Sequence, residues 1–226
     1  GLMTNLRADV EICPNVSDKK EGIRFFINGK MIEAKTSNVV SCEHCVVLAN
    51  VEEGAGTKIA LVEHFMAACA ICGIDNLDVY FKSQGYEIPI MDGSAKYWVE
   101  LFNQTGYQGE QAAVKPVSNH FVFSHNNSMI VLMPNQGKTT ITYAVNYNHP
   151  DLKNRWVNLD LDKNLDEIIE ARTFGYLKDL ETFQKMGYSK GVTIENTVGL
   201  TDDGGYTVAL RSEFEPAKHK ILDIIG

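Results

Sequence analysis

Residues 59–72, IALVEHFMAACAIC, lie within the longest apolar stretch of the chain, which only Glu63 and His64 interrupt. Thr57, just before this stretch, is a residue type that caps helices, and Gly73, just after it, is the type that most often ends them. We therefore predict a helix over residues 59–72. The stretch is shorter than the ~20 residues that cross a bilayer, so we expect a buried helix and no transmembrane segment.

Strand patterns precede and follow this helix. Asn28-Gly29 favours the positive φ angles of a type I′ turn, so residues 23–27 and 31–32 are predicted to form a hairpin. Two short segments, residues 78–81 and 86–90, predict a second hairpin. The other elements expected in this part of the chain are strands at residues 6–13 and 46–51 and a helix near residues 95–103.

Residues 108–118 begin with small and polar side chains and are typical of a domain boundary. Asn164 and Glu167 beyond it have the spacing of a capping box at the start of a helix. The elements predicted after the boundary are strands at residues 121–123, 128–133 and 139–147, and helices at residues 165–171 and 176–186.

A weak internal repeat relates the two parts of the chain. Gly73-Ile74-Asp75-Asn76 and Thr193-Ile194-Glu195-Asn196 each follow a predicted helix and precede a predicted strand, a Gly-Tyr turn, a strand and a helix. The pattern favours an α+β fold of two similarly built α+β domains, residues 1–110 and 111–226.

The composition excludes several classes of protein. The chain has 226 residues, enough for a substantial core, and a net charge of −8. An acidic chain is a poor nucleic-acid binder, so we expect no nucleic-acid partner. The first residues do not have the pattern of a signal peptide, and the five cysteines are an odd number. We therefore expect reduced thiols and a cytoplasmic location.

His219 and Asp223 are the most specific local pair. Ser212 and Glu215 indicate a helix start just before them, and residues four apart on a helix point to one face. An imidazole and a carboxylate at this spacing can bind one divalent metal ion. The same spacing is also found in ion pairs on helix surfaces, and spacing alone does not separate the two interpretations.

Glu63 and His64 stand among apolar residues, where charged side chains are costly unless they have partners. A third metal ligand, His64, beside an unligated carboxylate, Glu63, would suit metal-assisted hydrolysis, since the carboxylate can accept a proton from water. Three protein ligands with one open position are the catalytic zinc pattern. The alternative is an amphipathic helix with two residues at its solvent-facing edge.

Two further motifs have competing interpretations. Cys42-Glu43-His44-Cys45 and Cys69-Ala70-Ile71-Cys72 have the spacing of a four-cysteine zinc ribbon. Cys69 and Cys72 lie in the predicted apolar helix, however, where free cysteine is an ordinary core residue. Thr173, between two predicted helices, can donate to a developing oxyanion or simply cap a helix.

These segments together resemble the UDP-3-O-acyl-N-acetylglucosamine deacetylase (LpxC) family. The matching segments follow the family's order and span almost the whole chain. They are VEHFMAA (62–68), GIDN (73–76), EIPIMDGSA (87–95), NHP (148–150), ARTFG (171–175) and HKILD (219–223).

The resemblance implies two α+β halves whose helices are sandwiched between two outer sheets. It also implies a monomeric cytoplasmic enzyme that removes the N-acetyl group of UDP-3-O-acyl-N-acetylglucosamine in lipid A biosynthesis. The implied zinc (Zn2+) ligands are His64, His219 and Asp223, with Glu63 as the general base. The implied catalytic and substrate-contacting residues are Thr173, Lys220, Phe174 and Arg172, and an apolar passage for the acyl chain is expected near Val192 and Ile194.

The sequence departs from the family pattern at several positions. Residues 1–5, GLMTN, replace a strand followed by Gly-Leu-His-x-Gly, and Val192 and Pro216 replace a glycine and an apolar or aromatic residue. The family's Gly-His-x-x-Asn segment, whose histidine is a second acid–base group, has no counterpart. We therefore expect part of a longer protein, truncated at both ends. The alternatives are a non-catalytic relative that binds a nucleotide sugar or zinc, and a structural zinc protein that uses its four cysteines.

Overall fold

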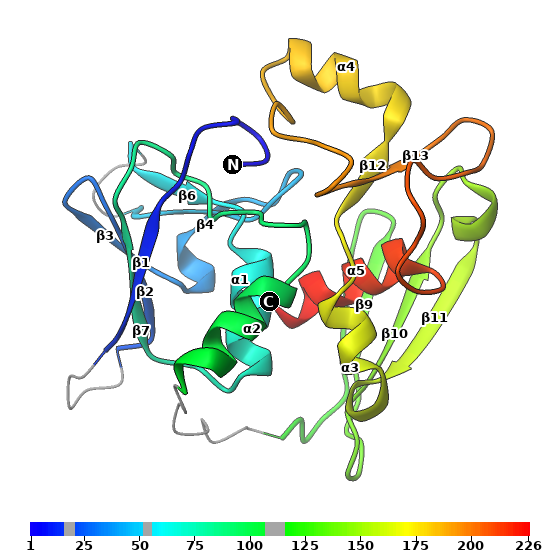
Figure 1. The fold of residues 1–226 in the computed structure, drawn as a ribbon. Helices are drawn as coiled ribbons and strands as arrows, with labels where there is room; N and C mark the ends of the chain where they lie inside the picture. Colours follow the sequence, from blue (N-terminus) through cyan, green and yellow to red (C-terminus); the bar gives the residue numbers. More distant parts are fainter. Residues whose placement is uncertain (16–20, 52–55, 107–115) are drawn as a thin grey trace.

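The computed structural model describes residues 1–15, 21–51, 56–106 and 116–226, and these residues form a mixed α+β fold (Figure 1). The predicted boundary between residues 110 and 111 lies outside them. The strands are β1 (Val10–Pro14), β2 (Ile23–Ile27), β3 (Lys30–Glu33), β4 (Val39–Ser41), β5 (Val47–Ala49), β6 (Lys58–Ala60), β7 (Leu77–Phe81), β8 (Phe121–His125), β9 (Ser128–Leu132), β10 (Thr140–Val145), β11 (Arg155–Asp160), β12 (Phe174–Tyr176) and β13 (Val198–Leu200). The α-helices are α1 (Glu63–Ile71), α2 (Lys96–Thr105), α3 (Leu161–Ile169), α4 (Leu177–Lys185) and α5 (Glu215–Ile225).

The largest sheet has the strand order β1-β7-β2-β3. The predicted hairpin between β2 and β3 is confirmed, because Asn28 and Gly29 both have positive φ angles, 51° and 73°. The predicted hairpin of residues 78–81 with 86–90 is wrong. Strand β7 lies between β1 and β2, and the backbone groups of Tyr86 and Ile88 instead bond to Ala60 on β6.

The long apolar stretch divides into a strand and a helix. Residues 58–60 form β6, which pairs antiparallel with β5, and Leu61 has a φ of 60° that breaks the strand. Helix α1 therefore begins at Glu63, four residues later than predicted. Its end agrees with the prediction, because Gly73 adopts the left-handed conformation with φ 67°.

The second part of the chain contains the hairpins β8–β9 and β10–β11 and the parallel pair β12–β13. Helix α3 begins at Leu161, where the Asp160 side chain accepts a bond from the amide of Asp162, so the predicted capping box at Asn164 is wrong. Helix α5 begins at Glu215 with Pro216 in its first turn. Ser212 does not cap it, since its Oγ has no hydrogen-bond partner in the described part of the chain.

Helix packing brings distant segments of the chain together. Helix α1 packs against α2 and α5, and α5 also packs against α3 and β10. In Figure 1, α1 and α2 lie beside the four-stranded sheet, whereas α3 and α5 lie beside β10 and β11. One continuous apolar core includes Phe65 of α1, Trp98 of α2 and Ile221 of α5. The contact between α1 and α5 is what positions the candidate site.

No described helix has the combined length and apolar character that a membrane crossing requires.

Candidate metal centre

His64, His219 and Asp223 meet where α1 packs against α5. Their ligand atoms all lie within 4.8 Å of one another. The distance from Asp223 Oδ1 to the Nε2 atom is 3.6 Å for His64 and 3.5 Å for His219. The two imidazole rings lie 4.7 Å apart at an interplanar angle of 85°. Within the described residues, this is the only cluster of three histidine, cysteine or acidic side chains with the spacing of a metal site.

Helix α5 and the segment before β12 orient His219. His219 and Asp223 are one helical turn apart, so both project toward α1. The Nδ1 atom of His219 lies 2.9 Å from the carbonyl oxygen of Ala171, which can only accept a hydrogen bond. Nδ1 must therefore carry the proton, and Nε2 keeps its lone pair on the side facing Asp223 and His64.

The protonation states of this cluster suit a metal ion. Burial lowers the pKa of His64 to about 3 and also lowers the pKa of His219, so both rings are neutral near pH 7. Burial disfavours ionisation of Asp223, but the pKa of Asp223 still lies below its usual value, and near pH 7 the charged Lys220 beside it favours the carboxylate. Asp223 Oδ1 is buried and has no hydrogen-bond partner in the described residues. Two neutral imidazoles and one unsatisfied carboxylate oxygen are a typical set of ligands for zinc.

Glu63 lies beside this cluster but is not part of it. Its Oε2 atom accepts a hydrogen bond of 3.0 Å from the amide of Val46, and its side chain is buried. Burial raises the pKa of Glu63 to about 7. A carboxylate with such a pKa can accept a proton near neutral pH, which a fully exposed glutamate does less well.

Lys220 and Phe174 border the cluster on the side of β12. Lys220 Nζ donates a 2.9 Å hydrogen bond to Asp223 Oδ2 and lies 5.6 Å from the centroid of the Phe174 ring. Burial favours the neutral amine, but Asp223 outweighs burial and raises the pKa of Lys220, which therefore stays charged. The Phe174 ring meets His219 edge to face at 6.3 Å.

Arg172 occupies a different environment. Its guanidinium group is buried and forms an ion pair with Glu215, at 2.8 Å from Nε to Oε1 and 3.0 Å from Nη2 to Oε2. Nη2 also donates to the carbonyl of Ala209 at 2.8 Å. In the structure, the guanidinium group of Arg172 donates its hydrogen bonds to Glu215 and Ala209. A contact between Arg172 and the substrate stays a prediction.

Thr173 is held in place by backbone hydrogen bonds on both sides. Its amide donates to Gly93 at 2.8 Å, and its carbonyl accepts from Val198 at 2.9 Å. Gly93 has a φ of 85°, and a Cβ added there would lie 1.8 Å from the carbonyl oxygen of Asn196. The Asp92-Gly93-Ser94 turn therefore has a structural role, and only glycine fits at its centre.

The substitution Gly93→Ala is expected to destabilise the protein and displace Thr173. The left-handed backbone alone costs roughly 1–3 kcal/mol for a non-glycine residue, and the overlap with Asn196 adds to it. Gly73→Ala is the matched control, because Gly73 has a φ of 67° but no atom lies within 4 Å of its added Cβ. Denaturant unfolding should give a clearly larger loss of stability for Gly93→Ala. Equal losses of stability in the two variants would contradict the close approach of Gly93 to the carbonyl of Asn196.

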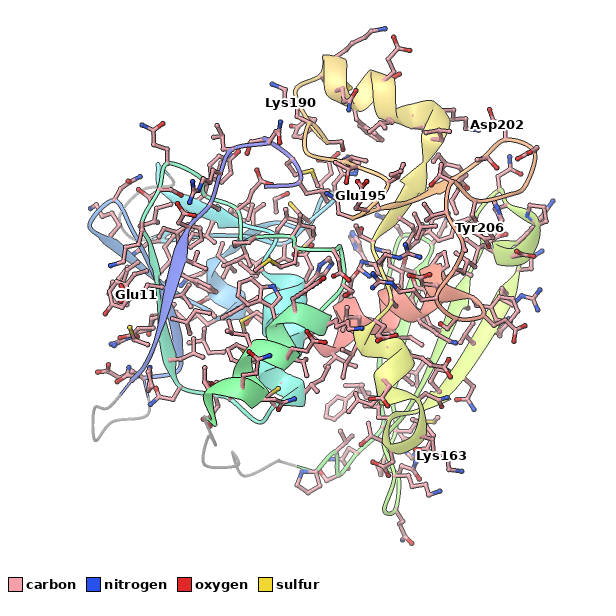
Figure 2. All side chains as sticks on the ribbon, viewed as in Figure 1. Glu11, Lys163, Lys190, Glu195, Asp202 and Tyr206 are labelled. Atoms are coloured by element: carbon pink, nitrogen blue, oxygen red, sulfur yellow. The ribbon has the colours of Figure 1, made fainter. Side chains whose placement is uncertain are left out.

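A cavity of about 490 Å³ adjoins the cluster and is lined mainly by apolar side chains. Thr173 and Phe174 belong to its wall, as do Val192 and Ile194, near which the resemblance to the family implies an apolar passage. Its use by an acyl chain stays a prediction. Lys190 and Glu195 mark the loop between α4 and β13 that forms part of the wall (Figure 2). Other lining residues were missed, because no sequence spacing relates them: Leu2, Met3, His44, Tyr147, Phe183 and Tyr188.

The four cysteines of the two Cys-x-x-Cys motifs do not form a metal site among the described residues. Cys42 is exposed, whereas Cys69 is buried in α1 and Cys72 is the residue at the C-terminal cap of α1. Burial raises the pKa of Cys69 and raises that of Cys45 to about 11, so without a metal ion both are protonated thiols near pH 7. The geometry of the described residues therefore gives the structural zinc interpretation no support.

Comparison with known proteins agrees with the geometry of the site. The model of the family described as LpxC, UDP-3-O-acyl N-acetylglycosamine deacetylase, matches residues 1–226. The UDP-3-O-acyl-N-acetylglucosamine deacetylase of Leptospira biflexa serovar Patoc (strain Patoc 1 / Ames) is 33% identical over 194 residues, which are 83% of this chain and 63% of the relative. The enzyme of the same name from Nostoc sp. (strain PCC 7120 / SAG 25.82 / UTEX 2576) is 31% identical over 235 residues, covering 100% of this chain and 82% of the relative.

A third deacetylase of this name, from Thermodesulfovibrio yellowstonii (strain ATCC 51303 / DSM 11347 / YP87), is 31% identical over 232 residues and also covers 100% of this chain. The chain spans 63% of the length of the Leptospira relatives that it matches. The family model matches the whole chain, and relatives that align with the whole chain are about 31% identical to it. The chain belongs to the UDP-3-O-acyl-N-acetylglucosamine deacetylase (LpxC) family.

Proposed function

We propose that this protein catalyses the zinc-dependent hydrolysis of the N-acetyl group of UDP-3-O-acyl-N-acetylglucosamine, releasing acetate, as a cytoplasmic step of lipid A biosynthesis. One observation carries the proposal. In a chain of this family, the buried His64 and His219 and the half-buried Asp223 converge around the unsatisfied Asp223 Oδ1 beside the carboxylate of Glu63.

The residues have distinct roles in this proposal. His64, His219 and Asp223 hold the zinc ion. A bound zinc ion lowers the pKa of water and polarises a carbonyl group. Glu63 accepts the proton of the attacking water, since its pKa of about 7 leaves it half-ionised at neutral pH. Thr173 and Lys220 stabilise the negative charge that develops on the acetyl oxygen.

The cavity and the charged groups suggest how the substrate is bound. We assign the acyl chain to the apolar cavity, because Phe174 in its wall meets the metal ligand His219 edge to face. The diphosphate is anionic while the whole chain carries a net charge of −8, so local positive charge is needed. Lys220 supplies such a charge beside Phe174.

The arrangement of the elements is also part of the proposal. We interpret residues 1–110 and 111–226 as two α+β halves of one monomer, with their helices between two outer sheets. The packing of α1 on α2 and α5, and of α5 on α3 and β10, supports this interpretation. The site then lies between the halves, since His64 comes from the first and His219 and Asp223 from the second.

The alternative to hydrolysis is binding alone. His64, His219 and Asp223 could hold a zinc ion, and the adjoining cavity could hold part of a nucleotide-sugar ligand, without turnover. The second candidate is therefore a binding protein without hydrolytic activity.

One experiment separates the two candidates. The purified chain is loaded with one equivalent of zinc, and acetate release from UDP-3-O-acyl-N-acetylglucosamine is followed alongside binding of the same ligand. Zinc-dependent acetate release that a chelator abolishes supports the deacetylase. Stoichiometric zinc and ligand binding without acetate release would support the binding protein and overturn the proposed activity.

A further inference from the structure

The backbone of residues 171–173 connects the metal cluster with the cavity wall; Ala171 and Arg172 are bound to α5, and Thr173 is bound to the turn at Gly93. The carbonyl of Ala171 orients the His219 ring of α5 at 2.9 Å. The amide of Thr173 donates to Gly93 at 2.8 Å. Arg172, between them, is bound to Glu215. A shift of this segment would therefore displace a metal ligand and the proposed oxyanion donor together.

Glu215 binds this segment to the start of α5. Its side chain is fully buried, and its two carboxylate oxygens accept four hydrogen bonds. Oε1 accepts from the amide of Arg172 at 3.0 Å and from its Nε at 2.8 Å. Oε2 accepts from Nη2 of Arg172 at 3.0 Å and from the amide of Arg211 at 2.7 Å. Both the backbone and the side chain of Arg172 are thus fixed relative to α5.

The placement of this ion pair suggests a role beyond stability. A buried ion pair is weak evidence for stability, because well-packed apolar residues often replace it without loss. Bidentate geometry, in contrast, fixes distance and orientation. Glu215 lies one helical turn before His219, so the pair fixes the helix that carries His219 relative to the Ala171 carbonyl that orients its ring.

We propose that the Arg172–Glu215 ion pair is a positioning device for the metal centre, which holds the His219 imidazole and the Thr173 hydroxyl in place for zinc and substrate. The inference rests on the proposed function. Arg172 and Glu215 act through Ala171, His219 and Thr173, and neither touches the metal ion or the reacting atoms.

Replacing Glu215 is expected to weaken zinc binding without removing a ligand. Groups that orient metal ligands typically contribute about 10–100-fold to metal affinity or activity. Glu215 acts one step further out, so we expect about a 10-fold loss of zinc affinity in Glu215→Gln and Arg172→Lys. The visible spectrum of the cobalt-substituted protein should change as well, because it reports the geometry of the ligands rather than the stability of the fold.

The chain offers a matched control in the ion pair of Arg24 and Asp78. Their contacts are also bidentate, at 2.8 Å from Nε to Oδ1 and 2.8 Å from Nη2 to Oδ2, but they lie in the four-stranded sheet. Arg24→Lys should lower stability while zinc affinity and the cobalt spectrum stay as in the unmodified protein. Glu215→Asp, which keeps the charge but shortens the side chain, replaces Glu215→Gln if that variant does not fold.

Zinc affinity is measured by competition with a chromophoric chelator, and unfolding of each variant is followed in parallel. Weaker zinc binding and an altered cobalt spectrum in the Glu215 and Arg172 variants alone are the expected result. Unchanged affinity and spectrum in those variants would overturn the positioning role, as would an equal loss in Arg24→Lys. If the unmodified chain binds no zinc, the proposed function itself fails, and this outcome is distinct from the other two.

Discussion

The variant His219→Ala is expected to lose tight zinc binding and, with it, amide hydrolysis. His219 Nε2 is one of the three ligand atoms, and its removal leaves only His64 and Asp223. Changes to groups that merely orient a ligand cost about 10–100-fold in affinity, so loss of a ligand should exceed this range. The zinc content per chain, measured after dialysis against a buffered chelator, should fall from one to near zero.

His125→Ala serves as the control for this variant. His125 ends the exposed strand β8 and is not part of the metal cluster, so its removal should leave the zinc content at one per chain. Circular dichroism of both variants checks that the helices are retained. Full zinc occupancy in His219→Ala, with its fold intact, would show that the ion is held elsewhere.

The variant Glu63→Ala is expected to keep its zinc and lose most of its activity. Glu63 is buried beside His64 but lies outside the group of ligand atoms, so the affinity for zinc should change little. Removing a general base typically lowers a rate by about 10²–10⁴-fold. The measurement is kcat for acetate release by the zinc-loaded variant. Glu43→Ala removes an exposed glutamate before β5 and should retain full activity.

The pH dependence of hydrolysis should report the same carboxylate. A general base must be ionised, and burial raises the pKa of Glu63 to about 7. Activity should therefore fall as the pH drops through about 7, whereas an exposed glutamate would keep it down to the region of pH 4–5. Residual activity of Glu63→Ala should not show this acidic limb. If the activity of the variant fell in the same way below pH 7, a group other than Glu63 would be responsible for the pH dependence.

The local parts of the site could be predicted from the sequence, but their convergence could not. His219 and Asp223 share a helix face because they are four residues apart, and this follows from helix geometry alone. The position of His64 near them depends on the packing of α1 against α5, which no sequence spacing encodes. The residues alone leave His64 as a third ligand one of two interpretations, and the resemblance to the family selects it.

The secondary structure was predictable where a single residue type determines the backbone. Asn28-Gly29 determines the turn between β2 and β3, and Gly73 ends α1. The start of α1 was not predictable in the same way, because residues 58–60 are as apolar as a helix but pair with β5. Tertiary pairing overrides local pattern at such positions.

Burial and partners were the least predictable properties. The apolar pattern of residues 128–133 predicts a strand, and the structure confirms one, but Ile130 is 61% exposed and Met129 is 67% exposed. The positive charge of Arg172 suits a contact with an anionic substrate. In the structure, however, its guanidinium group is bound by Glu215, which is 43 positions away. Neither property can be read from neighbouring residues, because both depend on what the fold places opposite them.

Anomalous diffraction at the zinc absorption edge, from crystals of the zinc-loaded chain, tests the central claim most directly. The account predicts one strong peak at about 2.0–2.2 Å from the Nε2 atoms of His64 and His219 and from an oxygen of Asp223. A fourth position should be open to water beside Glu63. A peak at Cys42 and Cys45, or no peak between α1 and α5, would contradict it.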